Sequence, residues 1–257
     1  MNYCKKFELI YNKILDYIKT NNTDFYSFPD KKFKLPISDA IFCLEDKIRT
    51  YKFYLAIENY IETVKKEKDN LIVVDAGSGT GVLGIFTLYL GAGECIFLEN
   101  NPYSLLLSQN LATKLGYYNC EFILADATNI KLHKKYDLLI SETIEANLYN
   151  EDFTKIINNL TQFGNKNSEI IPQKVNVKIF QETDTEKIEI FAYEFDCKQG
   201  FQRRNIFLTN ESVINIYVKI DLVLFNQIVI KSGESPYFLN EKTFDYKNLK
   251  HPIFKFY

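Results

Sequence analysis

The most constraining feature of this sequence is a glycine-rich stretch, residues 73–84, which reads VVDAGSGTGVLG. Residues 71–74 are apolar enough for a buried strand of a parallel sheet, and residues 82–90 have the composition of a helix. Glycines let the backbone turn sharply and let a ligand approach the main chain closely. A strand, a glycine turn and a helix N-terminus together predict a nucleotide-binding corner of an α/β domain.

Strands and helices alternate through the middle of the chain. Further short strands are expected at 96–98, 121–124, 136–140 and 168–171, and helices at 102–115 and 152–163. This alternation predicts a parallel sheet with right-handed crossovers, the Rossmann-like α/β class. Helices are also expected before it, at 7–18, at 39–46 after a capping Ser38, and at 48–66.

The pattern changes after Pro172. Apolar and polar residues alternate, or β-branched residues cluster, at 174–181, 187–195, 213–220 and 223–231, and no helix is expected there. The sequence therefore predicts three parts. They are a helical segment with a lid over the ligand site at 1–70, a Rossmann-like domain at 71–172 and an antiparallel β-sheet or partial barrel at 173–257.

Composition excludes several classes of function. A formal net charge of -2 gives no electrostatic reason for capture by nucleic acid or by a membrane surface. The five cysteines are scattered and lack metal-ligand spacing, which favours free thiols in a reducing compartment. No stretch is apolar enough to span a membrane, and the N-terminus lacks the apolar run of a signal peptide. We therefore expect a cytoplasmic protein without a metal site.

Acidic residues stand at the ends of four expected strands, where open parallel sheets bind their ligands. They are Asp75, Glu99, Asp126 and Glu142. Glu99 ends the strand after the glycine turn, the place of the acid that accepts both ribose hydroxyls in Rossmann-type folds. Asp126 could accept from an adenine amino group, with the Ala127 backbone N–H facing the ring, or it could simply form a turn.

The glycine turn differs from the usual phosphate-binding loops. Residues 79–84 fit G-x-G-x-x-G only outside its usual register, and no G-x-x-x-x-G-K-[ST] motif occurs. The turn also contains no basic residue, which favours a ligand without phosphates.

Residues 73–84, with the acid that follows at LEN, resemble motif I and the next acidic position of class I S-adenosylmethionine-dependent methyltransferases. The resemblance extends from about residue 37 to 172. It implies that Asp75 and the glycine turn hold the amino-acid part of the cofactor, Glu99 the ribose and Asp126 the adenine edge. The implied cofactor-binding residues are Arg49, Asp75, Gly77, Gly79, Gly81, Glu99, Asn100, Asp126, Ala127 and Glu142.

Two further stretches resemble protein arginine methyltransferases. Residues 44–54, LEDKIRTYKFY, resemble the D-x-x-R-T segment of that family, which implies that Arg49 pairs with the cofactor carboxylate. Residues 141–151, SETIEANLYNE, resemble its double-glutamate loop. Two carboxylates there, Glu142 and Glu151, could clamp a planar guanidinium and orient one nitrogen toward the cofactor methyl. The T-H-W loop of that family is missing from this sequence.

These features favour an S-adenosylmethionine-dependent N-methyltransferase that releases S-adenosylhomocysteine. Its acceptor would be a cationic nitrogen of a protein, peptide or metabolite, and a homodimer is compatible with the family. One alternative is a small-molecule O- or N-methyltransferase on the same fold, and another is a catalytically silent cofactor-binding partner. Nucleic-acid methylation is disfavoured, because the chain is not basic and has SETI where such enzymes carry N/D-P-P-Y/F.

Overall fold

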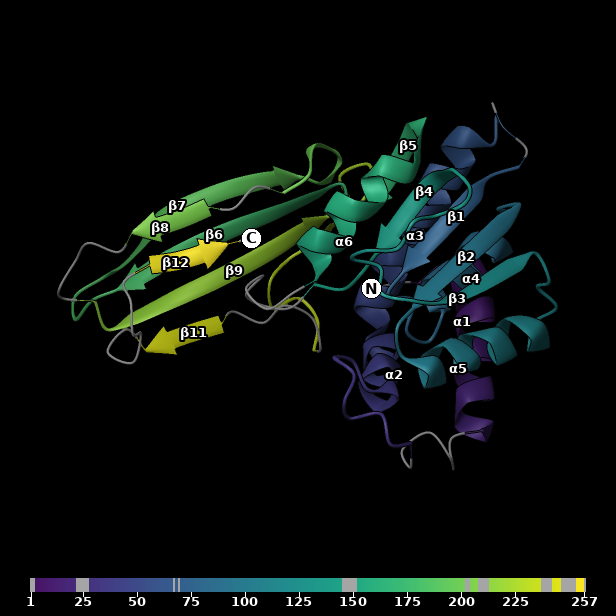
Figure 1. The fold of residues 1–257 in the computed structure, drawn as a ribbon. Helices are drawn as coiled ribbons and strands as arrows, with labels where there is room; N and C mark the ends of the chain where they lie inside the picture. The colour runs from purple at the N-terminus through teal and green to yellow at the C-terminus, as the bar shows by residue number, and fades with distance from the viewer. Residues whose placement is uncertain are drawn as a thin grey trace.

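A computed structural model of the chain describes residues 3–21, 28–66, 68, 70–144, 152–201, 204–207, 213–236, 242–245 and 253–256. A parallel sheet with its helices forms one side of the molecule, and an elongated antiparallel sheet extends from it on the other side (Figure 1). The change from one sheet to the other follows β5, at the Ile171–Pro172 peptide bond, which is cis.

The first sheet has the strand order β3-β2-β1-β4-β5, and every pair in it is parallel. Its strands are β1 (Ile72–Ala76), β2 (Glu94–Glu99), β3 (Cys120–Leu124), β4 (Tyr136–Ser141) and β5 (Gly164–Ile171). The predicted Rossmann-like sheet is confirmed. The chain moves outward from β1 to β3 and then returns to β4 on the other side of β1. This reversal opens a crevice at the carboxyl ends of β1 and β4.

The helices cover this sheet. They are α1 (Lys5–Thr20), α2 (Ile37–Glu45), α3 (Lys47–Val64), α4 (Val82–Tyr89), α5 (Pro102–Lys114) and α6 (Phe153–Leu160), followed by the 3-10 turn η2 (Thr161–Phe163). Aromatic rings fix α3 between α1 and α4. The Tyr54 ring lies 5.4 Å from that of Phe7 and 5.3 Å from that of Phe86. Because these three rings are fully buried, α3 is a rigid support for residues at its N-terminus.

Two acidic side chains cap the N-termini of α2 and α3. Asp46 begins α3, because its Oδ1 accepts the backbone N–H of Arg49 at 3.1 Å. The prediction that Ser38 caps α2 is wrong. Asp30 takes this role from seven residues before the helix, and its Oδ2 accepts the Ile37 N–H at 2.6 Å. The reason is burial: Asp30 is held inside the protein against the helix end, whereas Ser38 is half-buried and donates to Asp39.

The second sheet is antiparallel, as predicted, with the order β10-β9-β6-β7 and with β11 also paired to β9. Its strands are β6 (Lys174–Glu182), β7 (Lys187–Asp196), β9 (Asn215–Val223), β10 (Val229–Ile230) and β11 (Lys242–Asp245). The 3-10 turn η3 (Cys197–Gln199) follows β7, and β8 (Arg204–Phe207) pairs with β12 (Ile253–Phe256). Buried and less buried residues alternate along β6 and β9, as the sequence pattern indicated.

The prediction of one strand over 223–231 is wrong. The strand β9 ends at Val223, and the chain turns at Asn226 and Gln227 because both have positive φ angles, 47° and 63°. Only β10 continues as a strand. Strands β8, β11 and β12 were not predicted. The division of the chain at residues 70 and 172 stays a prediction.

Within the described residues, no helix is both long and apolar enough to cross a bilayer, and no cluster of three metal-ligating side chains occurs. All five cysteines are free.

Candidate active site

A cavity of about 190 Å³ opens at the carboxyl edge of the parallel sheet. Of the residues predicted from the sequence, seven line it: Arg49, Gly77, Glu99, Asn100, Asp126, Ala127 and Glu142. Among the other predicted residues, Asp75, Gly79 and Gly81 are not part of its lining, and Glu151 falls outside the described residues. The position of the cavity agrees with the crevice expected from the strand order.

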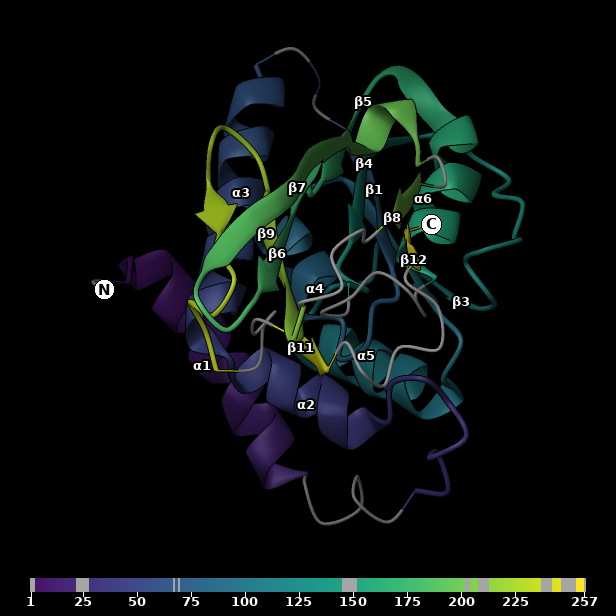
Figure 2. The same ribbon diagram turned by 90° about the vertical axis from the view of Figure 1, so that its left-hand side faces the viewer.

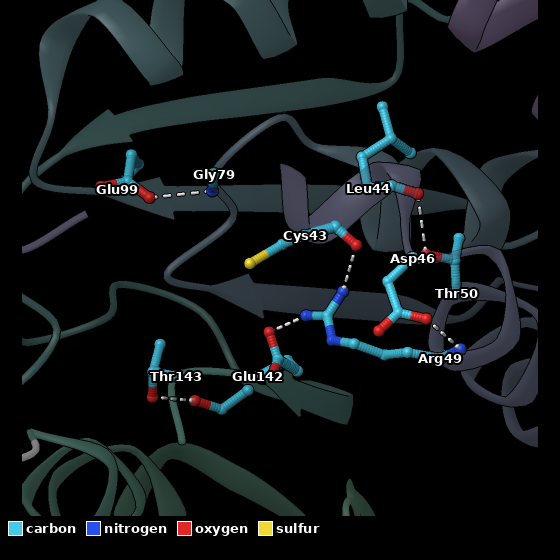
Figure 3. Close-up of polar contacts among 10 residues, drawn as sticks. Cys43, Leu44, Asp46, Arg49, Thr50, Gly79, Glu99, Glu142 and Thr143 are labelled. Carbon is cyan, nitrogen blue, oxygen red and sulfur yellow. Dashed lines mark hydrogen bonds and ion pairs between the residues drawn. The ribbon is translucent and has the colours of Figure 1, made fainter. Parts of the chain in front are cut away.

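A buried ion pair crosses the cavity wall. Arg49 at the start of α3 extends its guanidinium to Glu142, which follows β4, and its Nη2 pairs with Glu142 Oε2 (Figure 3). Arg49 Nη1 also donates to the Cys43 carbonyl at 3.0 Å. The two side chains are only 5% and 13% exposed. Burial lowers the pKa of Arg49, but arginine remains charged near neutral pH, so this is a pair of ions in a poorly hydrated site.

Glu99 is held by backbone N–H groups on both carboxylate oxygens. Its Oε2 accepts from Gly79 at 2.8 Å (Figure 3), and its Oε1 accepts from Asn100 at 2.8 Å and Asn101 at 2.9 Å. Burial raises the pKa of Glu99, and the three N–H donors act in the opposite direction. The side chain is therefore fixed in one orientation at the cavity, a preorganised acceptor for hydroxyl groups.

The Asp75 carboxylate lies away from the cavity. It is 2% exposed and accepts the Gly84 N–H of α4 at 2.8 Å. Burial raises its pKa to about 7, repulsion by Glu99 adds to this, and the Gly84 hydrogen bond and Arg49 oppose it. Asp75 therefore joins the end of β1 to the first turn of α4, on either side of the glycine turn.

Two glycines of the turn are required by close packing. Gly77 has a φ of +72°, and a Cβ there would lie 2.3 Å from Thr143 Cγ2 in the cavity wall. Gly81 precedes α4 with a φ of +79°, and a Cβ there would lie 2.5 Å from Ser108 Cβ of α5. The turn thus brings α4 against α5 and leaves the cavity floor without side chains at Gly77.

Asp126 forms a local turn as well as lining the cavity. Its Oδ1 accepts the N–H of Thr128 at 2.8 Å and the Thr128 hydroxyl at 2.7 Å. The Ala127 carbonyl accepts Asn159 Nδ2 at 3.0 Å, which fixes the adjoining peptide. The turn interpretation of Asp126 therefore holds, and it is compatible with a ligand contact from the same loop.

Comparison with known proteins identifies the domain. A family model described as a methyltransferase domain matches residues 67–207, which is more than half of the chain. The chain belongs to this methyltransferase family. A stretch of this chain is also 29% identical over 109 positions to histone-arginine methyltransferase CARMER of Drosophila ananassae, covering 42% of this chain and 20% of that protein. The probable histone-arginine methyltransferase CARMER of Drosophila melanogaster is 28% identical over the same length and the same shares.

The methyltransferase fold is similar to solved structures over most of the chain. The Trypanosoma brucei PRMT1 enzyme-prozyme heterotetrameric complex with AdoHcy has a TM-score of 0.63 and 15% identity, over 80% of each chain. Arabidopsis thaliana protein arginine methyltransferase 10 has a TM-score of 0.63 and 14% identity, over 80% of this chain and 81% of that one. These likenesses show the fold. The chain spans about a fifth of the length of the curated relatives it matches.

Sequence reasoning missed several residues that line the cavity. Lys34 and Asp152 line the cavity and form an ion pair at 2.5 Å, although they lie 118 positions apart. Asp152 was expected to be the first residue of the helix at 152–163. It occupies the N-cap position of α6, and its side chain pairs with Lys34 and Lys155. Cys43 lines the cavity from α2. No spacing rule signals the Lys34–Asp152 contact, because it joins segments distant in sequence.

Replacing Gly77 with alanine is expected to lower the free energy of unfolding by about 2–4 kcal/mol, because the positive φ and the collision with Thr143 add together. Urea denaturation measures this. Gly116→Ala is the matched control, since Gly116 also has a positive φ, +83°, but nothing lies within 4 Å of its added Cβ. Thr143→Ser, which removes Cγ2, should restore part of the loss in the Gly77→Ala background. Equal losses in the two alanine variants would contradict the packing argument.

Asp75 should make the methyltransferase domain less stable as the pH rises. Its folded pKa, about 7, exceeds the ordinary value of 3.8, so the folded protein binds the proton more tightly than the unfolded chain. The contribution of Asp75 to the free energy of unfolding is therefore constant below about pH 4 and decreases between pH 4 and 7. Above pH 7 it is lower by about 4 kcal/mol than at low pH. Asp75→Asn removes this titration. Urea denaturation should show that the free energy of unfolding of the variant increases relative to that of the wild type from pH 4 to pH 8. A difference between the two proteins that stays constant with pH would refute the raised pKa of Asp75.

Proposed function

We propose that this chain is an S-adenosylmethionine-dependent N-methyltransferase that modifies a guanidinium or another cationic nitrogen of a protein or peptide and releases S-adenosylhomocysteine. The observation that carries the proposal is the convergence of Arg49 and Glu142 in a cavity that also presents Glu99. The relatives described above are named for histone-arginine methylation, which supports this acceptor class.

The residues present fit the cofactor. The ligand's carboxylate would bind the guanidinium of Arg49, and its ribose would bind the fixed carboxylate of Glu99 beside Asn100. Its adenine would lie against the loop of Asp126 and Ala127. The floor at Gly77 has no side chain to obstruct the ligand. Asp75, Gly79 and Gly81 would contribute by shaping the turn.

The proposed chemistry depends on positioning. When bound, S-adenosylmethionine supplies an electrophilic methyl group on sulfur. Glu142 would bind the cationic acceptor together with Glu151, and two carboxylates match the paired N–H groups of a guanidinium. They would orient one nitrogen for in-line attack, and most of the rate gain would come from this orientation. As the bond from nitrogen to the methyl carbon forms, the bond from that carbon to sulfur would break and leave the neutral thioether of S-adenosylhomocysteine. The nitrogen would lose a proton, and Glu142, which lines the cavity, would accept it.

Labelled S-adenosylmethionine tests this proposal. The purified chain is incubated with arginine-rich peptides, free arginine derivatives and cell extract, and the labelled atom is then located. We expect label on a guanidinium nitrogen of the peptides. Label on oxygen, on nucleic acid or only on small metabolites would contradict the proposal, and the last result would favour the small-molecule alternative. Light scattering on the same sample tests whether the chain forms a homodimer.

A further inference from the structure

The segment that leads into α2, residues 28–36, forms part of the cavity wall and is attached at both sides. We call it the N-terminal strap. Lys34 and Leu35 of the strap line the cavity, and the Lys34–Asp152 ion pair attaches the strap to the start of α6. On the opposite side the strap passes beside α5 (Figure 2), where it meets one buried side chain.

That side chain is Asn101, which has no exposed surface and uses all of its polar groups. Its Oδ1 caps α5 by accepting the Tyr103 N–H at 3.0 Å, and its own N–H donates to Glu99 Oε1 at 2.9 Å. Its Nδ2 donates to Asp30 Oδ2 and to the Leu35 carbonyl, both at 3.2 Å. Asn101 therefore connects the helix end, the acid of the cavity and the strap.

Asp30 extends this connection to the other end of the cavity. Its carboxylate is 4% exposed and also accepts the first N–H of α2, that of Ile37, at 2.6 Å. The same helix carries Cys43, whose carbonyl accepts from Arg49 Nη1. A series of hydrogen-bonded groups thus runs from Glu99 through Asn101, Asp30 and α2 to Arg49.

We infer that Asn101 is a positioning residue for the cofactor. By binding Asp30 and Leu35 it holds the N-terminal strap against the cavity and fixes the positions of Glu99 and Arg49 relative to each other. This inference rests on the proposed function, because the ligand retained under the strap is S-adenosylmethionine or its demethylated product. The role is separate from substrate contact, since Asn101 is fully buried behind the cavity wall.

Asn101→Asp isolates this role. A carboxylate oxygen can still cap α5, but the donor to Asp30 and Leu35 is replaced by a negative charge that faces Asp30. We expect the strap to detach and the dissociation constant of S-adenosylhomocysteine to rise about tenfold or more, from two lost hydrogen bonds and the added repulsion. Asn110→Asp makes the same change at an exposed site of α5. It should alter neither the attachment of the strap nor the dissociation constant of S-adenosylhomocysteine.

The reversed pair provides a rescue. Adding Asp30→Asn to Asn101→Asp puts the amide donor on the strap and the acceptor on α5, and the amide oxygen introduced on the strap can still accept the Ile37 N–H. We expect this double variant to recover most of the lost affinity, although the Leu35 carbonyl keeps no donor from position 101. A role in folding alone would not produce recovery of ligand affinity by exchanging the two side chains.

Hydrogen exchange without ligand and calorimetry with S-adenosylhomocysteine separate the outcomes. Exchange at the Phe33 and Ile37 amides, which the wild type protects through Asp30, should quicken in Asn101→Asp and slow again in the double variant. Unchanged exchange would overturn the attachment, and quickened exchange with unchanged affinity would overturn the positioning role. If the wild type binds no S-adenosylhomocysteine, the proposed function fails while the exchange data still decide the attachment. Should Asn101→Asp not fold, Asn101→Ser keeps a capping oxygen, removes the amide group that donates to Asp30 and Leu35, and is judged by the same two measurements.

Discussion

Glu142→Gln is expected to lower the rate of methyl transfer by about 10²- to 10³-fold, because a neutral amide cannot hold a cationic nitrogen or accept its proton. The change preserves the size of the side chain, and the amide oxygen can still accept a hydrogen bond from Arg49. Binding of S-adenosylhomocysteine should therefore stay within about tenfold of the wild type. Single-turnover assays with the peptide identified by labelling measure the first effect, and calorimetry measures the second.

Glu189→Gln is the matched control for this experiment. Glu189 lies on β7, is 40% exposed and pairs only loosely, at 3.3 Å, with Lys178 on the neighbouring strand. Turnover should not change in this variant. If Glu142→Gln kept full activity, Glu142 would not be the acceptor-binding carboxylate. A wild type without any activity would instead support a catalytically silent role for the chain.

Arg49→Leu is expected to lower the free energy of unfolding by about 3–5 kcal/mol, because it leaves the carboxylate of Glu142 in a poorly hydrated site without its cation. It should also weaken binding of S-adenosylhomocysteine by about 100-fold or more, since the proposed partner of the ligand carboxylate is removed. Urea denaturation and calorimetry measure the two losses.

Two variants show whether the losses in Arg49→Leu depend on the geometry of the guanidinium and on the burial of the Arg49–Glu142 pair. Arg49→Lys keeps the charge but cannot donate to Cys43 and Glu142 at once in the same planar arrangement, so it should recover only part of both losses. Lys198→Leu breaks an ion pair with Glu169 in which the lysine is 47% exposed, and this should cost about 1 kcal/mol or less. Arg49→Leu with an effect as small as that of Lys198→Leu would show that the buried pair has little importance.

The central sheet could be predicted because its signals are local. Each strand contains a short apolar run, the glycine turn lies between β1 and α4, and acids stand at or near the ends of four strands, so local sequence alone indicates the carboxyl edge. The β region was harder. Residues 223–231 read as one strand, since nothing in their composition signals the turn at Asn226 and Gln227. Its short strands β8, β11 and β12 also leave weak patterns in the sequence.

The sequence by itself determined the fold class of the methyltransferase domain and seven of the residues that line its cavity, because periodicity and glycine spacing act within a few residues of chain. Only the tertiary structure decided which side chains meet. It paired Arg49 with Glu142, turned Asp75 toward α4, and replaced Ser38 by Asp30 at the start of α2. Each of these contacts depends on burial of polar groups between distant segments, where an unpaired group is costly, and such pairing leaves no local pattern to read.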